Sequence, residues 1–285
     1  MIGVRTTRME NSMKRISWSI IPLLTIAAAL LAGCMSSAIV PDPGPDPAVR
    51  QVLAPTGKLR VGVYLGSPTS MIREPKTGEI KGVSIDLGRE LAKRLGIPFE
   101  PVVYPRLAEV IEALKSGQVD FTVTNASAAR AKIVDFTPPL LGLELGYLVL
   151  PGSPVSTLAD VDRPGIRVGV SQGSSSQGVL TREFKHAQVV PAPTTKDAIE
   201  MLSQRKVDAF ATNKAILFEM YDSLPNSLVL DGRWGLEHMA IAIPKGRDKA
   251  MAYMRRFAED VTARGLVARA AERAGLRGTV KSESR

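Results

Sequence analysis

The sequence contains few of the residues from which metal centres, disulfides and nucleophilic active sites are built. Its 285 residues include one cysteine and two histidines. A single cysteine cannot form an intramolecular disulfide. His186 and His238 lie far apart and do not have the spacing of a metal-ligand pair. The sequence therefore predicts no metal ion and no cofactor.

Aromatic residues are also scarce, and positive charge is in excess without being concentrated. Aromatic residues make up 5% of the chain, and the formal net charge is +9 at pH 7. Basic residues are interspersed with acidic ones and form no basic run, which argues against a nucleic-acid-binding surface. We interpret the charge as a solvated surface with a bias toward anionic ligands, and we expect no nucleic-acid partner.

The first 33 residues have the pattern of a signal peptide. Lys14-Arg15 precede an uncharged segment, residues 16–32, that is somewhat short for a membrane span. The segment ends in Leu-Ala-Gly-Cys34, which resembles a bacterial lipobox. The resemblance implies that Cys34 becomes the lipidated first residue of the mature chain, which leaves no thiol for other chemistry. The alternative is a buried core cysteine. Met13 offers a second start of translation.

Residues 34–56 are predicted to form an extended linker. They include the run Pro-Asp-Pro-Gly-Pro-Asp-Pro. Proline fixes φ and lacks a backbone donor, so this run cannot be helical. We expect a semi-stiff tether between the lipid and the folded part of the chain.

A repeat divides the rest of the chain into two similar halves. Residues 114–125 recur as 202–213, with Leu, Val-Asp and Thr-Asn at the same offsets. Upstream, 60–67 is echoed by 167–174, and both begin with Arg-Val-Gly-Val. One duplication indicates two α/β lobes and not a solenoid. Ligands of open α/β sheets bind beyond the carboxyl ends of the strands, so we expect one cleft between the lobes.

Hydrophobic periodicity predicts the main elements. Strands are expected at 58–63, 99–103, 146–150, 228–230 and 239–243. Helices are expected at 83–95, 107–114 and 215–221, and again from 247 to 276. The first of these helices should end at Gly96. In the second half a strand begins at Arg167, and a helical pattern resumes at Val179 after a polar loop.

The clearest candidate site follows the strand that begins at Val119. Alternating residues run to Thr124 and Asn125, and a stretch of small residues then leads to Arg130. A guanidinium can bind a carboxylate through two parallel hydrogen bonds, and nearby hydroxyl and amide groups can complete the site. The alternative is a solvated arginine on the surface of a helix.

A second candidate is the small polar loop 171–177. A strand, a small polar loop and a helix in succession form a geometry that holds an anion through helix-start amides and hydroxyls. The loop is not followed by the Gly-Lys-Ser/Thr of a nucleotide-binding P-loop. The alternative is a flexible serine loop without a ligand.

In their order and spacing, these motifs resemble the bacterial extracellular solute-binding proteins of family 3, the polar-amino-acid receptors of ABC importers. The resemblance extends over about residues 59–276. Besides the lipobox, Arg-Val-Gly-Val and the Thr124 to Arg130 stretch, the motifs that carry it are 82–87, 135–139, 173–176, 207–209 and 240–246.

The resemblance implies a two-lobed, type II periplasmic-binding-protein-like α/β fold. Each lobe would be a mostly parallel sheet flanked by helices, and two strands would form the hinge. Lobe 1 would comprise 57–144 with 241–276 returning to it, lobe 2 would comprise 145–240, and 277–285 would be a disordered tail. The resemblance also implies a monomeric, lipid-anchored periplasmic receptor that closes on a solute and delivers it to an ABC permease in the inner membrane.

The site residues follow from the same resemblance. Arg130 would hold the α-carboxylate of the ligand, helped by Thr124 and Asn125. The loop residues Ser174, Ser175 and Ser176 would donate from the second lobe. Asn213 occupies the place where family members usually carry the Asp that binds the α-amino group.

Three residues or segments depart from the family pattern. Asn213 is neutral, so a ligand ammonium would lose its usual counter-charge in a closed cleft. The loop 66–71 lacks the usual stacking aromatic residue, and Ser84 replaces an acidic residue. We therefore expect a small polar carboxylate-bearing solute, an amino acid or a derivative, and the altered amino end favours a carboxylate or another polar metabolite over a standard amino acid.

Two other functions compete with solute binding for import. Some relatives of this fold are periplasmic dehydratases of the cyclohexadienyl type, which need a general acid over the leaving group. Glu144, Glu237 and His238 are candidates, but no constellation singles them out, so we expect no catalytic residues. Relatives fused to peptidoglycan-cleaving domains do not fit a chain that ends after its second lobe. A ligand receptor for a membrane sensor is the other alternative.

Overall fold

Parallel strands, each followed by a helix, form the first half of the fold. The computed structural model describes residues 46–280. Strand β1 (Leu59–Tyr64) pairs in parallel with β4 (Phe99–Tyr104), and α2 (Val83–Leu95) connects them. The predicted apolar face of α2 is buried, and Gly96 ends the helix in the left-handed conformation, with φ 64°. The predicted helix and its end are therefore confirmed.

The first lobe grows from this pair of strands. Val61 pairs in parallel with Phe121, directly ahead of β5 (Thr122–Asn125). Strand β12 (Gly235–Pro244) then pairs antiparallel with β5 and with β6 (Val134–Phe136). The smaller elements of this lobe are β2 (Ile72–Arg73), β3 (Ile80–Lys81), α3 (Leu107–Lys115) and α4 (Ala128–Ala131). Two C-terminal helices, α8 (Asp248–Ala263) and α9 (Leu266–Arg273), return to cover it.

The second lobe repeats the same plan. Strands β8 (Arg167–Ser171), β9 (Gln188–Ala192) and β10 (Ala209–Asn213) are parallel to one another. Its other elements are η1 (Leu158–Asp160), α5 (Ser175–Glu183), α6 (Thr195–Ser203), α7 (Lys214–Ser223) and β11 (Leu228–Val229). The lobe has its own buried clusters, one around Val168 and Val170 and one around Phe210 and Leu217.

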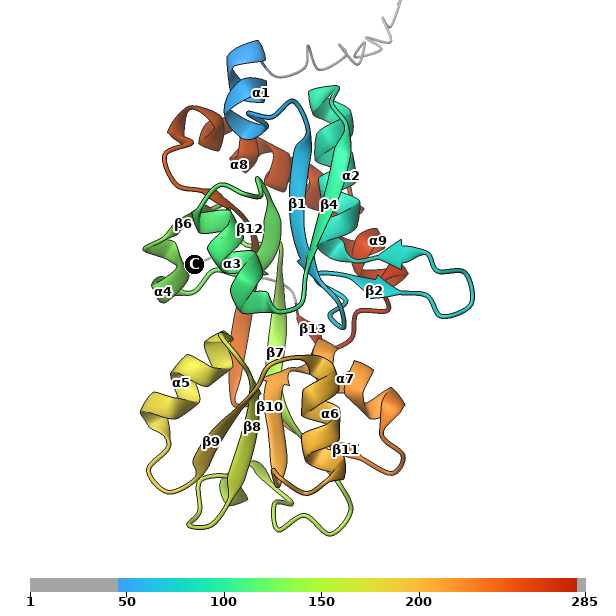
Figure 1. The fold of residues 1–285 in the computed structure, drawn as a ribbon, viewed down its shortest axis with the longest axis vertical. Coiled ribbons are helices and arrows are strands. Elements are labelled where there is room, and N and C mark those ends of the chain that lie inside the picture. Colours follow the sequence, from blue (N-terminus) through green and yellow to red (C-terminus); the bar gives the residue numbers. More distant parts are fainter. Residues whose placement is uncertain (1–45, 281–285) are drawn as a thin grey trace, which may run out of the picture. The chain divides into compact units, whose positions relative to one another are not determined.

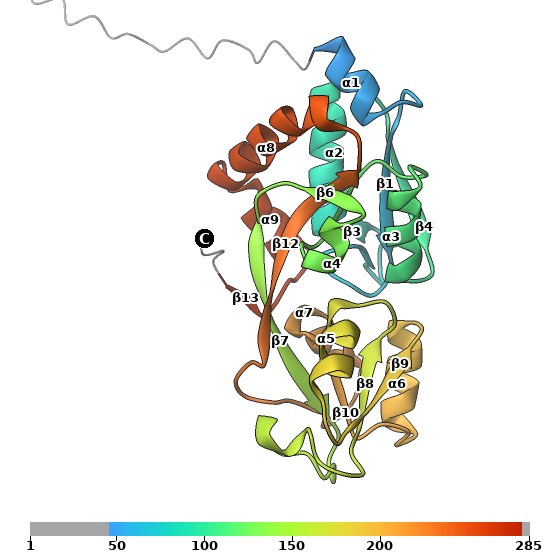
Figure 2. The same ribbon diagram turned by 90° about the vertical axis from the view of Figure 1, so that its left-hand side faces the viewer.

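Two long strands cross between the lobes. Strand β7 (Leu141–Val149) pairs with β12 over Leu141–Leu145, and its remaining part pairs with β10. Figures 1 and 2 both show β7 and β12 passing together from one lobe to the other. The predicted two-lobed α/β fold is confirmed, and these two strands are its connection.

A repeated ion pair explains the sequence repeat. The backbone N–H and Nε of Arg60 both donate to Asp120 Oδ2, and Nη2 donates to Oδ1 at 2.8 Å. Arg167 makes the same three bonds to Asp208. In each lobe this bidentate pair joins the first strand to the segment before the strand that ends in Thr-Asn. The repeated Arg and Asp therefore form the same structural ion pair in each lobe.

Two of the expected segment boundaries are wrong. Helix α1 (Pro47–Leu53) lies inside the expected linker, because Asp46 caps it, Pro47 suits its first turn and Leu53 is buried. Strand β13 (Thr279–Val280) lies inside the expected tail and pairs antiparallel with β7. Helix α1 carries Val49, Val52 and Leu53 at i, i+3 and i+4 but is only 7 residues long and follows a Pro-rich run, and β13 has only 2 residues, so both are too short for a sequence pattern to define.

Three strand and helix predictions also need correction. Strand β7 begins at Leu141 and not at residue 146, and β12 begins at Gly235 and not at 239, because both continue across the hinge. Helix α5 begins at Ser175, because Ser174 caps it, although no apolar period shows before Val179. Strand β9 was not predicted.

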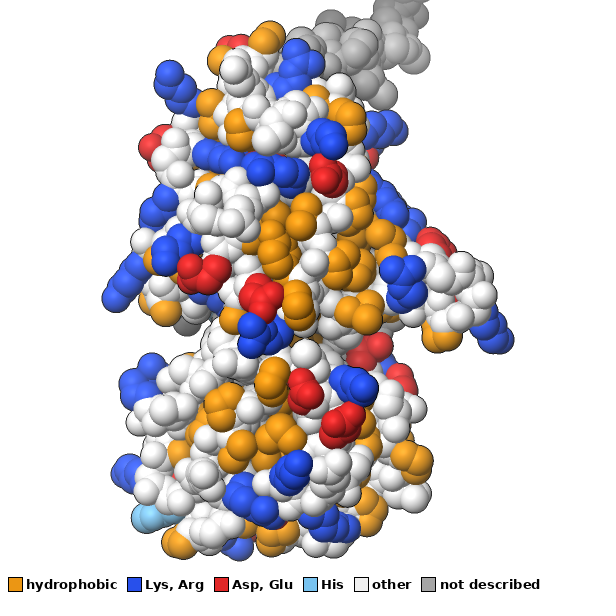
Figure 3. Space-filling model, viewed as in Figure 1, with side chains coloured by type: hydrophobic (Ala, Val, Ile, Leu, Met, Phe, Trp, Pro, Cys, Tyr) orange, Lys and Arg blue, Asp and Glu red, His pale blue; other side chains and the backbone are white. Residues whose placement is uncertain are grey.

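The described surface carries mixed charge. Figure 3 shows Lys and Arg side chains interspersed with acidic ones on one face of both lobes. No helix between residues 46 and 280 is long and apolar enough to cross a membrane. The predicted signal peptide and Cys34 lie outside the described residues.

Candidate functional site

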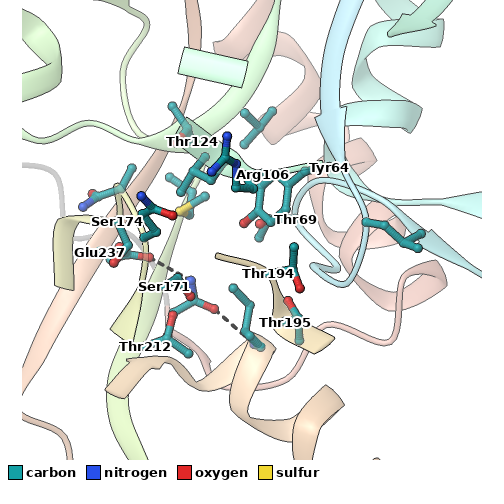
Figure 4. Close-up of a pocket in the computed structure, with 18 of the residues that line it drawn as sticks. Tyr64, Thr69, Arg106, Thr124, Ser171, Ser174, Thr194, Thr195, Thr212 and Glu237 are labelled. Carbon is teal, nitrogen blue, oxygen red and sulfur yellow. Dashed lines mark hydrogen bonds between the residues drawn. The ribbon is translucent and has the colours of Figure 1, made fainter. Parts of the chain in front are cut away.

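The candidate site is a narrow cleft between the two lobes. Its first-lobe wall includes Tyr64, at the end of β1, and Thr124, near the end of β5. Its second-lobe wall includes Ser171, at the end of β8, and Thr212, near the end of β10. Figure 4 shows these side chains around the pocket. The cavity volume is about 40 Å³, so the lobes lie close together in this structure. Strand ends from both lobes meet here, as the repeat predicts.

Arg130 is a buried cation in this cleft. It projects from the one-turn helix α4, and the residue is 7% exposed. Its Nη1 donates to Thr124 Oγ1 at 2.8 Å and to the Asn125 carbonyl at 3.4 Å. Its Nη2 donates across the cleft to the carbonyl of Gly173 at 3.3 Å.

The guanidinium of Arg130 has no counter-ion within residues 46–280. The acceptors of its hydrogen bonds are neutral, and no carboxylate of the described residues forms an ion pair with it. Burial lowers the pKa of Arg130, while the nearby charge of Glu237 acts in the opposite direction. A buried charge without a partner is costly. Arg130 is therefore a buried positive charge whose hydrogen-bond acceptors in the cleft are all neutral.

The cleft brings together most of the predicted site residues. Thr124, Asn125, Arg130, Ser174 and Asn213 all line it. Their clustering rests on the local fold: Ser174 caps α5, and Asn213 caps α7 through a bond from the Ile216 N–H to its Oδ1. The side-chain oxygen of Asn125 is occupied, since it accepts from the backbone of His238 at 3.0 Å.

Two predicted residues are placed differently. Ser175 and Ser176 are not among the residues that line the cleft. The hydroxyl of Ser175 donates to Glu237 Oε1. Ser176 is 1% exposed, and within the described part of the chain its hydroxyl has no hydrogen-bond partner. Ser84 is also buried outside the lining and bonds to Thr69 O and the Val123 N–H, so its role is structural.

Glu237 is the main site residue that the sequence argument did not place. It lies on the crossing strand β12, lines the cleft and is 6% exposed. Its Oε2 accepts from Asn213 Nδ2 at 2.9 Å. The expectation that the neutral Asn213 leaves this end of the cleft without negative charge is therefore wrong. The sequence names Glu237 only as a loose general-acid candidate; its position in the cleft follows from β12, which begins before residue 239.

Other lining residues were also missed. Tyr64 follows Arg-Val-Gly-Val directly and faces the cleft, and burial raises its pKa. It places an aromatic side chain two residues ahead of the loop 66–71, in which one was expected. Thr194 and Thr195 line the second-lobe wall at the start of α6 (Figure 4). Arg106 lines the first-lobe wall, where its guanidinium donates to Glu109 at 2.7 Å from Nε.

Comparison with known proteins agrees with this architecture. The model of the bacterial extracellular solute-binding proteins, family 3, matches residues 59–275. The chain belongs to this family. A glutamine-binding protein of Geobacillus stearothermophilus is 26% identical over 243 residues, which cover 81% of this chain and 92% of that protein. The chain is thus a solute receptor with the type II two-lobed fold.

Solved structures show the same fold. An amino acid ABC transporter substrate-binding protein from Streptococcus pneumoniae bound to L-arginine has a TM-score of 0.71 and 18% identity, over 79% of this chain and 97% of that one. An ancestral amino-acid-binding protein, described as a precursor of cyclohexadienyl dehydratase, has a TM-score of 0.67 and 23% identity, over 79% and 98%. At these identities the likeness concerns the fold.

Proposed function

We propose that this protein is the extracytoplasmic receptor of an ABC importer and binds a small amino-acid-like solute by its carboxylate. The observation that carries the proposal is Arg130, a buried guanidinium in the inter-lobe cleft with neutral acceptors around it. A ligand carboxylate would accept two parallel hydrogen bonds from it and supply the counter-charge. The glutamine-binding relative supports a ligand of this class. The cognate permease is the partner.

The receptor is further proposed to be lipid-anchored at Cys34 and to act as a monomer in the periplasm. The support is the sequence of residues 1–34 alone. Cys34→Ser should abolish incorporation of a labelled lipid and release the protein from the membrane fraction or leave it uncleaved. Unchanged labelling and fractionation of the variant would show that the anchor lies elsewhere.

A binding role suits the chemistry of the cleft better than a dehydratase does. Of the three general-acid candidates, Glu237 lines the cleft, whereas Glu144 pairs with Lys214 outside it. Both oxygens of Glu237 already accept hydrogen bonds from Ser175 and Asn213. These contacts suit a hydrogen-bond acceptor for a ligand better than a general acid, which has to donate a proton to the leaving group.

A thermal-shift screen tests the proposed ligand class. The chain from residue 35 onward retains the compact unit 42–285 and can be tested against amino acids, amines and carboxylates. A ligand at a hundred times its Kd stabilises by about 2.7 kcal/mol, which for a domain of this size is a rise in Tm of roughly 5–10 °C. We expect carboxylate-bearing solutes to stabilise and simple amines to have no effect. Stabilisation by amines alone would overturn the carboxylate assignment.

A further inference from the structure

Glu237 is the second buried charge of the cleft, and it comes from an unusual place. It is carried by the crossing strand β12, while Asn213 begins a helix of the second lobe. Its two oxygens accept from Ser175 and Asn213, which are both neutral. Within residues 46–280 no Lys, Arg or His forms an ion pair with it. Like Arg130, Glu237 is a buried charged side chain whose hydrogen-bond partners are neutral.

The two charges lie in one cavity but do not pair with each other. Both side chains line the cleft, and the charge of Glu237 raises the pKa of Arg130 against the effect of burial. Each keeps its own set of hydrogen-bond partners, Thr124 and Gly173 for Arg130, Asn213 and Ser175 for Glu237. A cleft that holds one positive and one negative side chain, not paired with each other, is complementary to a solute that carries both charges.

We propose that Glu237, and not residue 213, binds the cationic nitrogen of the ligand, so that the solute is a zwitterion held between Arg130 and a carboxylate on the crossing strand. This inference rests on the proposed function, which requires only the carboxylate end. Asn213 and Ser175 are positioning residues that orient the two oxygens of Glu237. The neutral Asn213 is then part of the arrangement, because an acidic residue there would repel Glu237.

A thermodynamic cycle tests whether Glu237 binds the ligand ammonium. It combines a substitution of Glu237 with removal of the amino group from the ligand. The tightest binder among the standard L-α-amino acids is compared with its desamino acid, which keeps the carboxylate and the side chain. Both are titrated calorimetrically into the wild-type protein and Glu237→Gln. Glutamine keeps the shape of Glu237 and can bond to both Asn213 and Ser175, so the change removes the charge alone. The matched control is Glu100→Gln on β4, because the Glu100 carboxylate lies at the surface, where it pairs with Lys58.

The expected result is a loss of discrimination. Wild type and Glu100→Gln should prefer the amino acid to the desamino acid by a factor on the order of a hundred. In Glu237→Gln this preference should fall to within a few-fold, with little change in the affinity for the desamino acid. A purely structural role for Glu237 would lower both affinities or the Tm and leave the preference intact, which would overturn the proposal.

The other outcomes separate this inference from the proposed function. If the wild type binds carboxylates but shows no preference for an ammonium group, the zwitterion assignment is wrong and the carboxylate receptor stands. If it binds neither probe nor any other carboxylate, the proposed function itself is wrong.

Discussion

Replacing Arg130 by methionine should separate ligand binding from stability. The change removes a buried charge but keeps a side chain of similar length. Without ligand, the protein loses hydrogen bonds to Thr124 at 2.8 Å and to Gly173 at 3.3 Å, each contributing about 0.5–1.5 kcal/mol, or more from a charged donor. It also escapes the desolvation of an unpaired guanidinium, which costs several kcal/mol. These contributions oppose each other.

The two measurements should therefore move differently. We expect the free energy of unfolding of unliganded Arg130→Met to change by no more than about 2 kcal/mol in either direction. Ligand affinity should fall by about two to four powers of ten, because breaking a buried ion pair costs roughly 3–5 kcal/mol. Urea unfolding without ligand gives the first quantity, and calorimetric titration with the best binder of the screen gives the second.

Arg106→Met is the control, because it shows whether removing any cationic side chain from the cleft weakens binding. Arg106 also lines the cleft, but Glu109 already pairs with it, so its removal should weaken binding less than tenfold. A near-wild-type affinity of Arg130→Met for the ligand would refute the proposal that Arg130 binds the ligand carboxylate. Destabilisation of the unliganded variant by more than about 4 kcal/mol would show instead that Arg130 is a structural residue.

Three further results are expected. Asn213→Asp should destabilise the unliganded protein by roughly 1–4 kcal/mol and weaken binding, because it sets a second carboxylate against Glu237; tighter binding would place the ligand ammonium at residue 213. Hydrogen bonds from Arg167 lower the pKa of Asp208 in the folded protein. Ionised Asp208 therefore stabilises the fold fully above the pKa of an aspartate in the unfolded chain, about 3.9, and this stabilisation is lost as the pH falls through the lower pKa of the folded state. The stability gap between wild type and Asp208→Asn in urea should thus narrow in acid, and a constant gap would argue against the pair. Small-angle scattering should show a smaller radius of gyration at saturating ligand when the free protein is open in solution. Identical profiles with proven binding would contradict hinge closure, unless the profile of the free protein already matches the closely packed lobes described above.

The architecture could be predicted because its signals are repeated and local. The paired Arg-Val-Gly-Val strands and Thr-Asn strand ends indicated two lobes facing one cleft, and the apolar period of α2 with Gly96 defined a complete helix. Arg130 could be found for the same reason, since it follows a strand end directly. Helix α1 and strand β13 escaped because short elements depend on capping and tertiary pairing more than on periodicity.

The charge balance of the cleft could not be predicted in the same way. Asn213 and Glu237 are 24 residues apart and lie on different elements, yet their side chains bond at 2.9 Å. Reading residue 213 alone suggested a missing counter-charge. Glu237 supplies this counter-charge because β12 carries it across the hinge, and the path of β12 is a property of the tertiary fold.

Helix α1 determines where mechanical load enters the protein. Arg247 donates to the carbonyl of Leu53, the last residue of α1, at 2.7 Å and also bonds to Asp120 at 2.8 Å. Figures 1 and 2 show α1 beside α8 on the first lobe. A pull on the chain ahead of residue 46 would thus be borne by the first lobe alone. The second lobe, joined to the first through β7 and β12, could swing about these strands without moving α1.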